Sequence, residues 1–503
     1  MRLRTLFALV LLAGCPGAAG IGDHCGDRGD CASSLQCVDS TCVPKCQRAP
    51  DCGDGYSCDK DGICHAATGQ LGDSCSSEVD CAAGLACELE GTATDPQGHL
   101  AASCVMQNAG RPAGDLCVHD GDCRNGTCAL GHCIDLCADT RDCGEGTACA
   151  LIPRVEATGA MFAGCLQAHG SLVFPLPVHG PSDFVALPIP DSARSVAVTF
   201  SVEDPSQAVG ATRVTAPDGT TVVTQQGYGD PVHWSDPVRH QLALGQSVLA
   251  MPSSPEAPLL PGVYEMSVAS QTVTQTAGSA TPSAIAVLKL DSTVNSSVIL
   301  DLHFYFLNFD EHPCLESFGG QLDAATARSK AFFQTDYLGQ LRSVFAHAGV
   351  ALGTSTYEDL RNHPDLDGLN AANAGSLFSL GAHAVGINVF FVRTLSPVGL
   401  QALGPAPGPA GLAGTRGSGI VIGADTLCYR SWPDVARLTA HELARYMGLY
   451  DNVEIDDSDA SPRRDPIRDS DISSSNLMYF SELGGTDLSP GQRDILTRSP
   501  VLR

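Results

Sequence analysis

The chain has 503 residues, of which 56 are acidic and 29 basic, so its formal net charge at pH 7 is −27. A chain of this length is long enough for about three domains. The acidic excess provides no electrostatic attraction to nucleic acid or to anionic lipid, and nucleic acid is therefore excluded as a partner.

The first twenty residues predict export. Two arginines precede an apolar run over residues 6–13, which is too short to span a bilayer and is typical of a secretory signal peptide. The run ends in LAGC, residues 12–15, which resembles a bacterial lipobox and implies that Cys15 is lipidated. Ordinary cleavage near Ala18 without a lipid is the alternative. We expect a lipoprotein of the cell envelope or surface, or a secreted protein, with membrane contact only through this lipid.

Residues 22–167 form a cysteine-rich region of internal repeats. All of the 23 cysteines except Cys15, Cys314 and Cys428 lie here, mostly with five residues between neighbours. An aspartate directly precedes a cysteine at Asp30, Asp51, Asp80, Asp122 and Asp142. Because no C-x-x-C pair and no zinc-finger histidine spacing occur, we expect disulfides, up to ten, each worth about 2–4 kcal/mol. The region is interpreted as a stapled stalk or spacer. Connectivity and partner binding stay open.

Residues 171–290 predict an all-β sandwich. Alternating runs at residues 195–200, 220–223 and 263–268 are separated by Pro-, Gly- and Ser-containing turn signals. The pattern resembles the accessory sandwich domains of many secreted peptidases. Asp230, His233 and Asp236 are close in sequence but are interpreted as scattered surface groups, and calcium has no support here.

Residues 297–503 predict an α+β domain. Strands are expected over residues 298–307, 386–392 and 417–422, a long helix over 322–348, and a final helix of about ten residues from 488 onward. The two isolated cysteines, Cys314 and Cys428, indicate a bridge within this domain rather than reactive thiols.

A short amphipathic stretch, residues 434–451, carries the candidate chemistry. It contains His441, Glu442 and Gly448 in the order H-E-x-x-x-x-x-G, and an apolar helical stripe stops at the glycine. The stretch resembles the active-site helix of the metzincin metallopeptidases, whose pattern is H-E-x-x-H-x-x-G-x-x-H. Here the second histidine is replaced by Arg445 and the third by Asp451.

The resemblance implies roles for these residues. His441 would be a zinc ligand, Glu442 the general base, and Asp451 a third ligand, as in a snapalysin-like variant of the family. Met478, about thirty residues after Gly448 in the run Asn476-Leu477-Met478, would lie beneath the metal in the methionine turn of the family. An ordinary core methionine is the alternative.

Arg445 cannot serve as a ligand because a guanidinium has no lone pair to donate. A unit charge 4 Å from a divalent ion is repelled by about 8 kcal/mol at an effective dielectric near 20. We therefore expect zinc to be absent and the arginine to hold Glu442 and Asp451 in a salt-bridge network. In the alternative, a histidine from elsewhere in the domain supplies the missing donor. The candidates for that histidine are His303, His312, His347, His363 and His383.

An acidic stretch over residues 451–471 could carry calcium, but it lacks an EF-hand arrangement and is interpreted as a solvated loop. Two functions follow from the sequence. The favoured one is an exported, lipid-anchored protein whose metzincin-like domain has lost catalysis and binds or scaffolds an extracellular protein or peptide. The other is an active secreted zinc metalloendopeptidase with a non-standard ligand set of His441, Asp451 and a donor from elsewhere.

Overall fold

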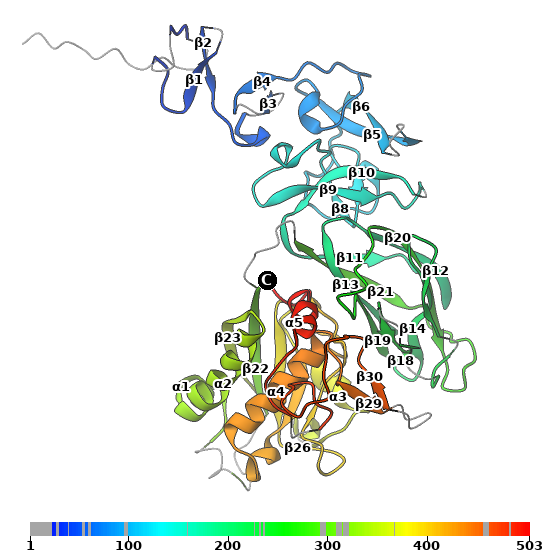
Figure 1. Ribbon diagram of the computed structural model, residues 1–503. Helices are drawn as coiled ribbons and strands as arrows, with labels where there is room; N and C mark the ends of the chain where they lie inside the picture. The colour runs from blue at the N-terminus through cyan, green and yellow to red at the C-terminus, as the bar shows by residue number, and fades with distance from the viewer. Residues whose placement is uncertain are drawn as a thin grey trace, which may run out of the picture.

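The computed structural model describes residues 23–503, apart from gaps at 27–29, 39, 53–55, 59–61, 95–98, 158, 226, 231–232, 235–236, 292–297, 308–313, 315–320, 367, 456–461 and 482–483. The signal segment and the lipidation candidate Cys15 lie outside the described residues. Figure 1 shows the chain running from the cysteine-rich repeats through a β domain to a mixed α/β domain. No helix in the described part is long and apolar enough to cross a bilayer.

The cysteine-rich region consists of five disulfide-bonded repeats, which confirms the predicted disulfide framework. In each repeat the first cysteine is bonded to the third and the second to the fourth, for example Cys25 to Cys37 and Cys31 to Cys42. The other pairs are Cys46–Cys58, Cys52–Cys64, Cys75–Cys87, Cys81–Cys104, Cys117–Cys128, Cys123–Cys133, Cys137–Cys149 and Cys143–Cys165. The hairpins of the repeats are β1 (Leu35–Val38) with β2 (Thr41–Pro44), β3 (Tyr56–Cys58) with β4 (Cys64–Ala66), β5 (Leu85–Thr94) with β6 (Leu100–Met106), β7 (Cys128–Ala129) with β8 (His132–Cys133), and β9 (Thr147–Pro153) with β10 (Met161–Gln167).

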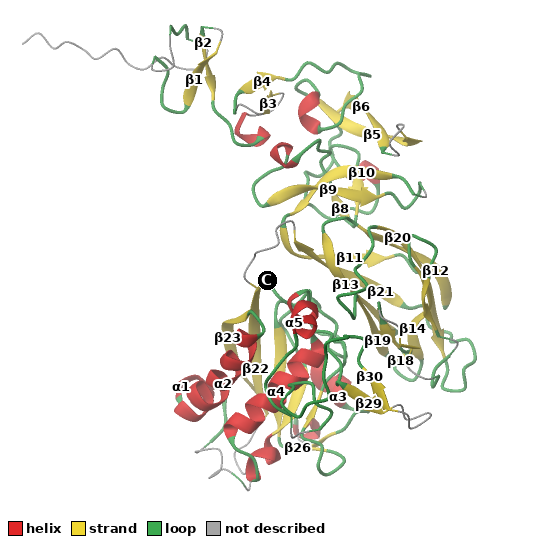
Figure 2. Ribbon diagram, viewed as in Figure 1, coloured by secondary structure: helices red, strands yellow, loops and turns green. Residues whose placement is uncertain are grey.

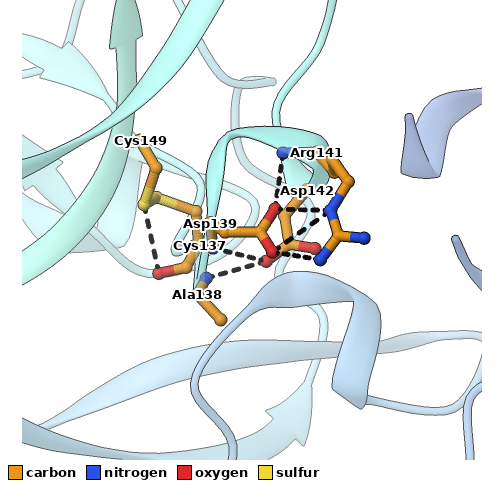
Figure 3. Close-up of polar contacts among 6 residues, drawn as sticks. All are labelled: Cys137, Ala138, Asp139, Arg141, Asp142 and Cys149. Atoms are coloured by element: carbon orange, nitrogen blue, oxygen red, sulfur yellow. Dashed lines mark hydrogen bonds and ion pairs between the residues drawn. A yellow bond between two sulfur atoms is a disulfide. The ribbon is translucent and has the colours of Figure 1, made fainter. Parts of the chain in front are cut away.

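The recurring aspartate before a cysteine is a backbone cap. Asp142 Oδ2 accepts hydrogen bonds from the backbone N–H groups of Ala138 and Asp139, at 2.7 and 3.2 Å (Figure 3). Asp80 and Asp122 make the corresponding pair of bonds in their own repeats. A short turn with so small a core has few other acceptors for these amides, so the repeat keeps the carboxylate.

Residues 169–291 form two antiparallel sheets with a shared core. One sheet has the order β11-β21-β13-β19-β17-β16 and the other β12-β20-β14-β15, with β18 paired to β14. Alternate side chains such as Leu187 and Val198 are fully buried between them. The strands are β11 (His169–Leu176), β12 (Ser182–Ile189), β13 (Ala193–Ser201), β14 (Ala208–Thr215), β15 (Thr221–Thr224), β16 (His233–Trp234), β17 (Arg239–His240), β18 (Ala243–Leu244), β19 (Gln246–Met251), β20 (Gly262–Gln271) and β21 (Ser283–Asp291).

The last domain is built on a five-stranded sheet of order β23-β22-β25-β28-β27, in which only β27 is antiparallel to its neighbour. Its two longest helices, α2 and α4, contact each other. Apart from short helical turns in the cysteine-rich repeats, the helices of the described chain belong to this domain (Figure 2). The main elements are β22 (Val298–Leu307), α1 (Ala324–Ser329), η5 (Phe332–Tyr337), α2 (Leu338–His347), β23 (Val350–Leu360), α3 (Ala374–Phe378), β25 (Ile387–Val392), β27 (Ala402–Leu403), β28 (Ile420–Gly423), α4 (Trp432–Tyr446) and α5 (Pro490–Thr497). Shorter elements are β24 (Gly368–Leu369), β26 (Thr394–Leu395), β29 (Val453–Ile455), β30 (Pro462–Arg464) and the 3-10 turns Pro364–Leu366 and Ala424–Cys428.

Two expectations for this domain are wrong. The single helix expected over residues 322–348 is interrupted, because Lys330 is extended (φ −91°, ψ 144°) and a π-helical turn follows it. The break changes which face of the helical segment is buried: Ala325 and Ala331 are exposed, whereas Phe333 and Tyr337 are buried. The strand expected from residue 417 begins at Ile420.

The β domain and the last domain are joined by direct contacts. The hydroxyl groups of Ser171 and Ser195 each donate to a carbonyl near the C-terminus, at 2.5 Å, and Lys289 Nζ donates to the Leu502 carbonyl at 2.5 Å. Val248 of β19 is part of the hydrophobic core of the last domain. Cys314 and Cys428 form a disulfide within that domain.

Candidate functional site

Helix α4 presents the candidate site residues. The Ser431 side chain and Asp434 form a reciprocal capping box at its start. Its apolar face is buried against the sheet, and the helix ends just before Gly448, which has φ +106°. Only glycine adopts this backbone conformation without strain, and the turn brings Asp451 back beside the helix.

His441 lies between two acceptors. Its Nδ1 is 2.8 Å from the Leu477 carbonyl, and its Nε2 is 3.1 Å from Asp451 Oδ1. A carbonyl and a carboxylate can only accept, so both ring nitrogens carry a proton when both contacts are made. Burial opposes this charge, but the bond to Asp451, the charges of Glu442 and Asp451 and the Leu477 carbonyl together raise the pKa of His441.

Asp451 is surrounded by positive charge. Although burial works against ionisation, His441 and the guanidinium groups of Arg445 and Arg239 hold the pKa of Asp451 below its ordinary value. Arg445 Nε lies 3.9 Å from Asp451 Oδ1, so it acts through charge more than through a close bond. The expected salt-bridge network holds for Asp451, with which Arg445 forms an ion pair, and is wrong for Glu442. The direct partner of Asp451 is His441, and no ion pair joins Glu442 to Arg445 in the described part of the chain.

Sequence reasoning missed Arg239 and the Leu477 carbonyl. Arg239 lies on β17 of the β domain, where its guanidinium sits 4.6 Å from the ring centroid of Tyr450. No local pattern marks it, since it reaches the site only through the packing of two domains. The Leu477 contact could have been found from the sequence, because Leu477 immediately precedes Met478 of the expected methionine turn.

The turn around Met478 is held by buried polar groups. Asn476 Oδ1 accepts from the Met478 backbone N–H at 2.8 Å, and Asn476 Nδ2 donates to Gln492 Oε1 at 3.0 Å. The Met478 carbonyl accepts from the Asn452 N–H at 2.7 Å. Met478 is fully buried in the core that also contains α4. The turn therefore fixes the position of the Leu477 carbonyl that His441 Nδ1 contacts.

The site opens into a small cavity of about 300 Å³. Glu442, whose side chain is largely buried, borders it together with His441, Arg445 and Asp451. The remaining lining residues are Gly399, Leu400, Gln401, Ala402, Arg437, Leu438, Phe480 and Ser481.

The donor set does not fit a three-ligand zinc. His441 Nε2 and Asp451 Oδ1 are 3.1 Å apart, which is near the separation of two ligands bonded at about 2.0–2.1 Å to one zinc ion. Within the described residues, however, no third His, Cys, Asp or Glu ligand atom gathers with this pair; every such group of three is made of cysteines from the disulfide-bonded repeats.

The histidines considered as substitutes do not reach the site where they are described. His303 Nδ1 is 2.8 Å from Thr356 Oγ1, its Nε2 is 2.8 Å from the Val385 carbonyl, and its ring stacks on His383 at 3.7 Å. His347 ends α2 and is exposed, His363 precedes the 3-10 turn Pro364–Leu366, and among the described residues neither is grouped with His441 and Asp451 as a possible metal ligand. His312 lies outside the described residues.

Comparisons with known proteins identify no relative in sequence. No protein-family description and no curated protein matches the chain. Among solved structures, the YxiM protein of Bacillus subtilis is aligned at 9% identity and a TM-score of 0.12 over 42% of this chain and 46% of its own. A family two carbohydrate esterase from Clostridium thermocellum is aligned at 8% identity and 0.13 over 44% and 65%, and one from Cellvibrio japonicus at 7% and 0.13 over 60% and 93%. Scores this low carry no argument about fold or function.

Proposed function

We propose that this is an exported protein, anchored through a lipid on Cys15, whose metzincin-like last domain has lost zinc catalysis and binds or scaffolds an extracellular protein or peptide. The disulfide-bonded repeats would hold this domain away from the surface. The signal segment and the lipobox support the location, and the −27 charge supports a partner other than nucleic acid.

The metzincin resemblance has structural support beyond the motif. The order of β22, a helical segment, further strands, α4 and then a buried methionine turn agrees with the order expected from the sequence. Gly448 turns the chain so that Asp451 returns to His441, where the resemblance would put a third ligand.

One observation carries the loss of catalysis. The Nε2 atom that would bind zinc faces the Asp451 carboxylate, and Arg445 adds a fixed positive charge beside that carboxylate. The pair is neutralised internally, so the fold needs no metal to satisfy either group. A divalent ion there would meet the repulsion of the guanidinium and find two protein donors instead of three.

The test is metal analysis of the purified mature protein, with Arg445→His as the restoring variant. We expect the wild-type protein to retain far less than one equivalent of zinc after dialysis, and Arg445→His to gain at least about tenfold in zinc affinity, because it restores a ligand one helical turn from His441. Arg342→His on the exposed face of α2 controls for an added histidine. One equivalent of tightly bound zinc in the wild-type protein, with peptide cleavage that Glu442→Ala abolishes, would reinstate the peptidase.

A further inference from the structure

A second and larger cavity lies between the β domain and the last domain. Its volume is about 690 Å³, within the range of small-molecule sites. The β domain contributes β17 and β19, and the last domain contributes α3 and the segment after β27. It shares no lining residue with the His441 cavity: Ala402 of β27 borders that cavity, and Leu403 borders this one. Because two domains build it, it exists only in the assembled chain.

Two arginines line this cavity in an otherwise acidic protein. Arg416 and Arg239 both border it. In the described part of the chain no carboxylate forms an ion pair with Arg416. Its guanidinium lies between the two domains beside two glycines: a Cβ added to Gly245 would be 3.1 Å from Arg416 Nε, and one added to Gly375 would be 3.0 Å from Arg416 Nη2. The chain thus leaves room for a cation that no internal anion neutralises.

A buried polar side chain without a complete set of partners also borders this space. Gln246 Oε1 is a buried acceptor without a hydrogen-bond donor among the described residues. Gln246 lines the cavity, and its amide nitrogen is 2.7 Å from the place that a Cβ on Gly417, another lining residue, would take. A buried polar group left unpaired costs about 1–3 kcal/mol, so such atoms are expected to meet a ligand or water. Gln246 Oε1 requires a donor.

An apolar wall completes the cavity. Phe378 of α3, Leu403 and Pro405 face the same space. A ligand that satisfies all of these features carries an anion for the arginine fork, an N–H or O–H donor close to it, and an apolar or ring-shaped body. Carboxylates with an adjacent donor have this chemistry, and they include N-acyl amino acids, as at a peptide C-terminus, and acidic sugars.

We propose that the interdomain cavity is a binding site for a small carboxylate with an adjacent hydrogen-bond donor, held by Arg416 and capped by Gln246. The site does not depend on the His441 cavity or on zinc. It joins groups from both domains, so an occupied site also strengthens their contact by mass action.

Calorimetric titration of the full mature chain tests this proposal with four probes: sodium N-acetyl-L-phenylalaninate, N-acetyl-L-phenylalaninamide, sodium D-galacturonate and D-galactose. At least one acid is expected to bind saturably with a Kd in about the millimolar range or tighter, and its neutral counterpart at least about tenfold more weakly. Binding of the first acid alone identifies an N-acyl amino acid, of the second alone an acidic sugar, and of both the shared carboxylate chemistry.

Variants separate this site from nonspecific anion binding. Arg416→Gln is expected to weaken the acid at least about tenfold and Arg416→Lys by less, because lysine keeps the charge but loses the fork. Arg342→Gln, on the exposed face of α2, is the matched control and is expected to leave the Kd within about twofold. Arg239 is not a clean test, since its charge also acts on Asp451. Failure of both acids to bind, equal binding of acid and neutral counterpart, or an unchanged Kd in a folded Arg416→Gln protein each overturns the proposal.

Discussion

Removing the carboxylate of Asp451 should destabilise the last domain in a pH-dependent way. Asp451→Asn removes the negative charge that lies 3.1 Å from His441 Nε2. It also removes the carboxylate that lies 3.9 Å from Arg445 Nε. The side chains of His441 and Asp451 are only 11% and 17% exposed, so solvent screens the loss poorly. Breaking a buried pair costs about 3–5 kcal/mol, and because His441 can release its proton we expect about 2–4 kcal/mol at pH 5.5.

The sign of the pH dependence follows from the two pKa directions. The pKa of His441 is raised from 6.5 in the folded state, so its contribution is complete below about pH 6.5 and declines as pH rises through the raised value. The pKa of Asp451 is lowered from 3.8, so its contribution is present above about pH 3.8 and is lost as pH falls through the lowered value. The free-energy difference between wild type and Asp451→Asn should therefore be largest between about pH 4 and 6.5 and smaller at pH 9.

Urea unfolding followed by Trp432 fluorescence measures this difference. Trp432 is buried in the last domain and stacks on Phe332 at 5.1 Å between ring centroids. A Trp234→Phe background makes it the single tryptophan, since the chain has two. Asp336→Asn, on an exposed position of the same domain, is the matched control. A cost for Asp451→Asn that equals the control, or one that does not change between pH 5.5 and 9, refutes the ion-pair reasoning.

Three further substitutions test the residues that hold the site and its domain in place. Gly448→Ala should destabilise the last domain by about 1–2 kcal/mol, because φ +106° is strained for any residue with a Cβ even though the space is open; urea midpoints measure it, and no cost would mean the turn relaxes freely. Asn476→Ala should cost about 1–3 kcal/mol, because it leaves the Met478 N–H without its acceptor and removes one of the two donors to Gln492 Oε1, which keeps the Ser489 N–H; a thermal shift equal to that of a surface Asn→Ala variant argues against this network. Replacing both Cys314 and Cys428 by serine opens a bridge across 114 residues and should cost about 3–5 kcal/mol in urea unfolding, whereas a loss below 1 kcal/mol would indicate that the unfolded chain remains structured there.

Much of the fold was predictable where local signals repeat. The cysteine spacing indicated disulfide repeats, and the aspartate before each second cysteine, which had no assigned role, is explained by its pair of backbone amides, as at Asp142. The strand over residues 298–307 has the expected bounds because eight of its ten residues are apolar or aromatic and it is buried on both sides in a parallel sheet.

The failures have physical causes. Strand β23 (Val350–Leu360) went unrecognised because it is an edge strand, half exposed, with the sequence VALGTSTYEDL and no continuous apolar face. The sequence predicts a continuous helix over residues 322–348 because apolar residues recur at helical spacing on both sides of Lys330. The π-helical turn after Lys330 instead places Phe333 and Tyr337 on the buried face. At the site, sequence placed Arg445 near Asp451 but could not place Arg239, which comes from another domain.

Under the proposed function, the charge balance at Asp451 accounts for a site that stays folded without zinc. Zinc bound to His441 would require a bare Nε2 lone pair, whereas Asp451 favours a proton on that same atom. Arg445 and Arg239 hold the carboxylate ionised, and the ionised carboxylate in turn holds the proton on His441. Each charge therefore stabilises the protonation state that, under the proposed function, competes with a metal. Replacing Arg445 alone removes one of the two guanidinium groups, and the proton on His441 still competes with zinc through Asp451 and Arg239.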